Sequence, residues 1–131
     1  MIDVESDVFR TVADVLPSGT VCRSSYQNAP RKFPLVTVEE IGNATQSRFE
    51  DSSGIENVSV VSYEVNVFSN AEGAKKKQAK GILSAVDTAM QSLGFERVSC
   101  QPTPNLADAT IFRITARYRA LIDKNKIVYR R

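Results

Sequence analysis

The sequence predicts an α+β domain in which two helices pack on one face of a mainly antiparallel sheet of about four to five strands, with a long projecting hairpin loop. Two stretches carry apolar residues at helical spacing, and several shorter stretches alternate apolar and polar residues as half-buried strands do. Most expected strands follow one another across turns, which favours hairpins over crossovers. At 131 residues the chain is expected to form one domain, residues 1–131, that needs no metal or disulfide.

The first half of the chain is expected to contain one helix and three strands. The helix is expected over residues 4–16, ended by Pro17 and Gly19, and its apolar stripe consists of Val8, Phe9, Val12, Val15 and Leu16. Strands are expected over residues 20–26, 35–41 and 57–69. The polar stretch at residues 42–56 is longer than a usual connection, so it is expected to project as a loop.

A second helix is expected over about residues 71–93. Ser69 and Glu72 have the spacing of a capping box, and Gly94 is placed to end the helix. Its apolar stripe consists of Ile82, Leu83, Val86, Met90 and Leu93. Strands are then expected over residues 95–100 and 110–122, followed by a C-terminal tail, residues 124–131, that either adds a short strand or frays.

Three arginines alternate with apolar residues along the strand at residues 110–122. Successive side chains of a strand point to opposite faces, so Arg113, Arg117 and Arg119 are expected on the face opposite the core. Three interpretations remain open: a solvated sheet face, a subunit interface or channel lining, and a nucleic-acid contact.

Four lysines lie near the start of the second expected helix, at Lys75, Lys76, Lys77 and Lys80. This is the end at which the helix dipole disfavours positive charge. They are expected either to be solvated or to meet an acidic partner, protein or nucleic acid. Residues 1–56 hold five Lys and Arg against nine Asp and Glu, whereas residues 57–131 hold twelve against six, a balance of −4 against +6. Such a bipolar chain suits head-to-tail contact between identical subunits, a basic face turned to a polyanion, or two solvated flanks.

The composition argues against an enzyme. The chain contains no histidine, which removes the commonest general base. Neither Glu39/Glu40 nor Glu50/Asp51 is placed as an acid–base pair, and no phosphate-binding, dinucleotide-binding or metal-ligand motif is present, so no catalytic, cofactor or metal site is expected. Cys22 and Cys100 are expected to be reduced, packed thiols.

No membrane contact is expected, because no apolar run approaches the roughly 20 residues that span a bilayer. The first ten residues lack the pattern of a secretory signal, which predicts a cytoplasmic site of synthesis and assembly.

Several stretches together resemble a known family. These are "KFPLVTVEEI", "RFEDSSGIENVSVVSYEVNVFSN", "GILSAVDTAMQSLGFERVSCQPTPNLADATIFRITARYRALID" and "IVYRR". Over residues 33–131 the chain resembles the tail terminator (tail completion, head-tail junction) proteins of tailed bacteriophages and prophages of Gram-positive hosts. The resemblance is most specific in "NLADATIFRITARYRA" and "YEVNVFSN".

The resemblance implies a structural, non-enzymatic virion protein. Such proteins are small α+β chains that assemble as a homo-oligomeric, hexameric ring on the last ring of tail tube protein, stop its polymerisation and meet the head-tail connector protein. The implied location is the head-proximal end of the virion tail, with transient contact to phage DNA in the channel. Two alternatives stay open: a head-side neck or head-completion connector protein, and a small nucleic-acid-binding module.

The resemblance also suggests roles for three groups of residues. The arginines and lysines named above are the candidates for a subunit interface or the channel. The loop residues Arg48, Glu50 and Asp51 are candidates for an arm reaching a neighbouring subunit or tube ring, although a surface loop explains them equally well. The terminal residues Tyr129, Arg130 and Arg131 are candidates for docking on an adjacent subunit.

Overall fold

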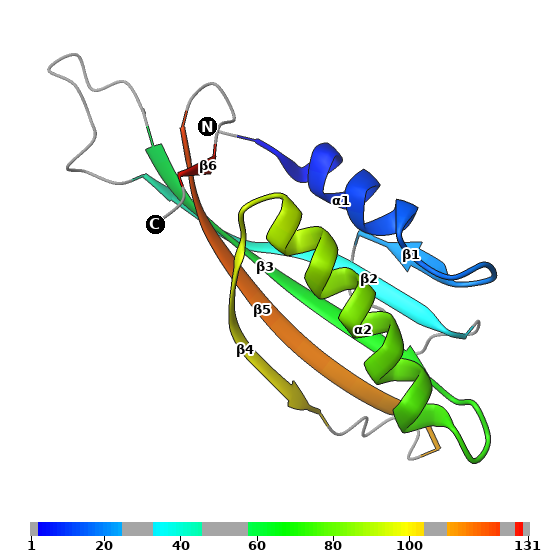
Figure 1. Cartoon of the computed structure of the whole chain (residues 1–131). Coiled ribbons are helices and arrows are strands. Elements are labelled where there is room, and N and C mark those ends of the chain that lie inside the picture. The colour runs from blue at the N-terminus through cyan, green and yellow to red at the C-terminus, as the bar shows by residue number, and fades with distance from the viewer. Residues whose placement is uncertain (1–2, 25–32, 46–57, 104–109, 124–127, 130–131) are drawn as a thin grey trace, which may run out of the picture.

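The computed structural model describes residues 3–24, 33–45, 58–103, 110–123 and 128–129. It confirms the predicted fold class: two helices pack against a five-strand mixed, mostly antiparallel sheet (Figure 1). The elements are α1 (Glu5–Asp14), β1 (Val21–Arg23), β2 (Leu35–Thr45), β3 (Val58–Ser69), α2 (Lys75–Ser92), β4 (Glu96–Pro102), β5 (Phe112–Asp123) and the two-residue β6 (Val128–Tyr129).

The strands are ordered β1-β2-β3-β5-β4, and β6 adds a short pairing to β5. All neighbours are antiparallel except β1, which runs parallel to β2. The centre of the sheet is the pair β3 and β5, which is in unbroken register from Val58 opposite Asp123 to Ser69 opposite Phe112. Because this register is continuous, the residues that face each other across the central pair are fixed along its whole length.

The main core lies between the sheet and the two helices, which cover the same face (Figure 1). The period-two pattern of β5 is confirmed, since its core side consists of Ile114, Ala116, Tyr118, Ala120 and Ile122. In α1, Val8 and Val12 are buried as expected, but Val15 is exposed because the helix ends at Asp14.

The opposite face of the sheet is not simply exposed. A second cluster of buried residues, Leu35, Phe68 and Ile111, lies there with Val21 and Phe33 packed against it. Phe68 points away from the main core, yet its side chain is fully buried in this second cluster. The open-face interpretation of the arginine strand therefore fails at this end of the sheet.

The start of α2 differs from the sequence prediction. The helix begins at Lys75, and its N-cap Ala74 makes no side-chain capping bond, so the capping box of Ser69 and Glu72 is wrong. The Ser69 hydroxyl instead bonds to the amide oxygen of Gln78 and accepts the N–H of Ala71. Side-chain bonds of this kind compete with a helix start, because they hold the backbone in a turn.

The predicted end of α2 is confirmed. Gly94 has a φ of 88°, a left-handed conformation that costs glycine little. The N–H of Phe95 donates to the carbonyl of Met90 at 3.0 Å across this turn. This bond satisfies one of the carbonyls that the last helical turn leaves unpaired.

The long loop is shorter than predicted at its N-terminal side. Residues 42–45 continue β2 and pair with residues 59–62 of β3 after a bulge at Ile41. Pairing with the apolar β3 overrides the low strand propensity of Gly42 and Asn43. The remainder of the loop, with the predicted arm residues Arg48, Glu50 and Asp51, lies outside the described residues.

The C-terminal tail contains a strand, as one of the two expectations had it. Tyr129 pairs with Leu121 of β5 in the same chain, while Arg130 and Arg131 lie outside the described residues. None of the described helices is long and apolar enough to cross a membrane.

Candidate functional site

The arginine face is the set Arg113, Arg117 and Arg119 on the side of β5 that faces away from the helices. Alternation along β5 places them there as predicted, because the intervening residues enter the main core. Their environments differ: the side chain of Arg113 is 13% exposed, against 58% for Arg117 and 49% for Arg119. Arg113 is therefore part of the packed structure, and the other two form the accessible surface.

Arg113 is held by three neighbours on β3. Its Nε donates to the Oδ1 of Asn66 at 2.9 Å, and its Nη2 lies 3.8 Å from Oε1 of Glu64. Its guanidinium stands over the ring of Phe68, 5.6 Å from the centroid. Such a set of contacts offsets the cost of withdrawing a guanidinium from water. Reversing this charge would damage the sheet, so Arg113 is a poor probe of an interface.

A chain of polar side chains continues from Arg113 across the sheet. Asn66 Oδ1 also accepts the hydroxyl of Thr115 at 2.7 Å, and the hydroxyls of Thr115 and Thr103 lie 2.8 Å apart. Asn66 and Thr115 are buried and directly opposite each other in the register. Neither residue is a candidate site residue from the sequence alone. The available signal was polar residues on the same face of two alternating strands, which becomes informative once their pairing is known.

The two accessible arginines have acidic partners on neighbouring strands. Arg117 lies 3.4 Å from Glu64 on β3, and Arg119 lies 4.0 Å from Glu96 on β4. By register, the described residues of this face also include one further arginine and two further carboxylates, namely Arg23, Glu39 and Asp123. The arginine face is thus balanced in charge. A balanced surface provides little of the electrostatic attraction that drives phosphate binding.

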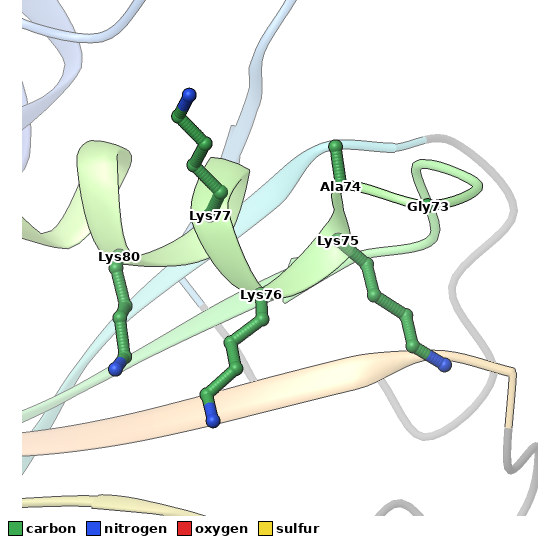
Figure 2. Close-up of a pocket in the computed structure, with 6 residues that line it drawn as sticks. All are labelled: Gly73, Ala74, Lys75, Lys76, Lys77 and Lys80. Carbon is green, nitrogen blue, oxygen red and sulfur yellow. The ribbon is translucent and has the colours of Figure 1, made fainter.

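The lysine cluster, Lys75, Lys76, Lys77 and Lys80, surrounds the first turns of α2. Together with Gly73 and Ala74 these lysines line an open surface hollow of about 660 Å³. Figure 2 shows Lys75, Lys76 and Lys80 extending on one side of the helix and Lys77 on the other. The ammonium of Lys75 donates to the carbonyl of Thr110 at 3.3 Å, which ties the helix start to the beginning of β5.

The lysine cluster and the arginine face do not form one surface. α2 covers the core side of the sheet, whereas the arginines occupy the other side. Within the described ranges, no carboxylate lies at ion-pair distance from the four lysines. Among the residues that the structure describes, the lysine cluster is therefore a positive patch without acidic partners, in contrast to the arginine face.

A separate polar group joins α2 to the sheet. The hydroxyl of Tyr118 donates to Oδ1 of Asp87 at 3.0 Å, and Arg97 on β4 lies 3.5 Å from the same oxygen. Burial first, and then the Asp87 carboxylate, raise the pKa of Tyr118 far above its usual value. A phenol that holds its proton this firmly serves as a fixed donor and not as an acid.

The remaining sequence candidates are dispersed. Glu39 is the ladder partner of Glu64 and Glu40 that of Tyr63, so the two carboxylates point to opposite sides of the sheet. Among the described residues, no group of three or more metal-ligating side chains could hold a metal ion. Both cysteines are free, as predicted, but Cys100 is exposed on the outer strand β4 and is not packed. Burial raises the pKa of Cys22 to about 11.

The chain was compared with known proteins at the level of sequence. No protein-family model matches it, and no curated protein matches it.

Proposed function

We propose that this chain is a structural virion protein of a tailed bacteriophage or prophage. Copies of it form a hexameric ring on the head-proximal end of the tail tube. The ring ends polymerisation of the tube protein and joins the tail to the head-tail connector. Its partners are further copies of itself, the tube protein and the connector, with DNA passing through the channel.

The observation that carries the proposal is where the resembling stretches lie in the fold. The two most specific ones, residues 63–70 and 105–120, run through β3 and β5. These strands pair along their full length and supply Glu64, Arg113 and Arg117 to the arginine face. The two stretches with the most specific resemblance therefore contribute to one surface of the sheet and to the core beneath it.

The chemistry of that surface supports a protein partner. Arg117 and Glu64 present both signs of charge within 3.4 Å of each other, on strands held in a fixed register. A partner must match such a pattern in position as well as in sign, which favours selective contact between proteins. Rings of identical subunits require two different patches that fit each other, and this chain has chemically distinct surfaces on its two sides.

A second function is favoured by one observation, the uncompensated lysine cluster. Four ammonium groups at a helix start could neutralise phosphates, as in a small nucleic-acid-binding module. A module whose four lysines neutralise about four phosphates loses about a hundredfold in DNA affinity between 50 and 200 mM salt. The ring protein is not expected to show this salt-dependent loss of DNA affinity. A measured loss of that size would favour the hypothesis of a nucleic-acid-binding module.

The proposed role is tested by deleting the gene from its phage or prophage and imaging the induced lysate by electron microscopy. We expect filled heads beside detached, over-long tails, with normal virions restored by a plasmid copy of the gene. Tails of normal length beside leaking heads would move the protein to the head side of the neck. Intact virions would reject a structural role altogether.

A further inference from the structure

An acidic cluster lies beside the start of α1. It consists of Asp3 and Glu5, which are exposed, and Glu40 on β2, whose carboxyl interacts with the charges of the other two. The Asp3 carboxylate accepts the N–H of Glu5 at 3.0 Å, and Glu40 is the direct ladder partner of Tyr63 on the side of the sheet that faces the helices. Within the described ranges, none of the three carboxylates makes an ion pair.

The hydroxyl of Tyr63 lies beside this acidic cluster without a hydrogen-bond partner among the described residues. The side chain is fully buried, with its ring edge-on to Phe95 at 5.6 Å. Burial, followed by the negative charges of Glu40, Glu5 and Asp3, raises the pKa of Tyr63. Leaving a buried hydroxyl unpaired destabilises the fold, because its hydrogen bonds to water are lost without replacement. Among the described residues, the site therefore lacks a positive charge. Glu40 accepts a bond from the amide of Asn43 at 3.4 Å, but the Tyr63 hydroxyl has no partner.

An ammonium group would supply the positive charge and a partner for this hydroxyl. It carries one positive charge and three N–H donors, enough for two carboxylates and the phenol oxygen. The described part of the chain holds such groups, without acidic partners, in the lysine cluster. Lys76 and Lys80 are exposed, stand one helical turn apart and extend on the same side of α2 (Figure 2).

The two clusters cannot meet within one copy. α1 and α2 pack against each other and run in opposite directions (Figure 1). The lysine cluster lies at the start of α2, whereas Tyr63 beside the acidic cluster contacts Phe95, which follows the end of α2. α2 has 18 residues, so its two ends are about 27 Å apart. The complementary charges are thus arranged head to tail, and a contact between them joins different copies. Such a heterologous contact closes into a ring when its rotation permits.

We propose that the lysine cluster of each copy docks on the acidic cluster of the next copy, with Lys76 or Lys80 placed between Glu5, Glu40 and the hydroxyl of Tyr63. The inference rests on the proposed ring and identifies the two surfaces that form its subunit contact. It leaves the arginine face free for the tube protein or the connector. Neither cluster includes a residue of that face, because Glu40 points to the opposite side of β2 from Glu39.

The contact is tested first by carbodiimide cross-linking of purified virions, which joins amines only to carboxylates that touch them. We expect peptides linking Lys76 or Lys80 to Asp3, Glu5 or Glu40, and these must join two copies because of the length of α2. Cross-links from these lysines only to another protein, or none, would overturn the proposal. Absence of the chain from virions would instead refute the proposed function.

Charge exchange provides the second test, with the deletion phage complemented by variant genes. Lys76→Glu with Lys80→Glu, and separately Asp3→Lys with Glu5→Lys, should each lower the yield of finished virions at least about tenfold, while combining all four restores it to within about threefold. Lys77→Glu is the matched control and should have little effect, because this side chain extends on the other side of α2. Circular dichroism checks that each variant folds. If the combined variant folds but does not restore the yield, while the wild-type gene does, the proposed pairing is wrong. The proposed ring role would not be affected by that result.

Discussion

Arg113 has a structural role, unlike the exposed arginines on the same face. Its replacement by alanine should therefore destabilise the fold. The change removes the 2.9 Å bond to Asn66, the 3.8 Å ion pair with Glu64 and the stacking on Phe68. A hydrogen bond to a charged group contributes about 1.5–3 kcal/mol, and a guanidinium over an aromatic ring adds about 0.5–1 kcal/mol. Because the side chain is only 13% exposed, little of this is lost to solvent screening. The expected loss is about 2–4 kcal/mol.

The matched control is Arg119→Ala on the same face of the same strand. Its side chain is 49% exposed and its ion pair with Glu96 spans 4.0 Å, so the expected loss is under about 0.5 kcal/mol. Urea unfolding followed by circular dichroism at 222 nm measures both, and the midpoint of thermal unfolding should fall by about 3–4 °C for each kcal/mol. If the two variants lose equal stability, Arg113 is not held as the structure describes.

Gly94→Ala should lower the unfolding free energy by about 1 kcal/mol, because φ is 88° at this position. Gly81→Ala, inside α2, should raise it by about 0.5–1 kcal/mol, since the added methyl meets nothing within 4 Å. Urea unfolding of both variants checks the opposite signs. At pH 8 only about one Cys22 thiol in a thousand is ionised, so a thiol reagent should label the exposed Cys100 at least about 100-fold faster in the native protein, and equal rates would contradict the burial of Cys22. Burial is the main cause that raises the pKa of Glu40 above its usual value of 4.5. Ionisation of Glu40 therefore lowers the unfolding free energy as the pH rises above this value. Glu40→Gln should raise the unfolding free energy at pH 7 and leave it unchanged at pH 3.

The sequence predicted the parts of the fold that depend on periodicity. Alternation along residues 110–122 was enough to separate Ile114 and Tyr118 from Arg117 and Arg119, because a strand has only two faces. The end of α2 was predictable for a similar reason. Gly94 has a local conformational role that does not depend on distant residues.

The parts that the sequence missed depend on pairing between distant segments. Arg113 reads as a surface residue until β3 places Asn66 and Phe68 beside it, 47 and 45 positions earlier in the chain. Gly42 and Asn43 read as loop until the register pairs them with β3. The acidic cluster was equally hidden, since Glu40 is brought to Tyr63 by the pairing of β2 with β3, and Glu5 is brought there by the packing of α1 on the sheet.

The most direct test of the ring proposal is a cryo-electron microscopy reconstruction of the head-tail junction in purified virions. We expect one ring of this chain between the tail tube and the connector, in which the start of α2 in each copy lies against the start of α1 in the next. Density for the chain elsewhere in the virion, or a ring whose copies meet through other surfaces, would contradict it.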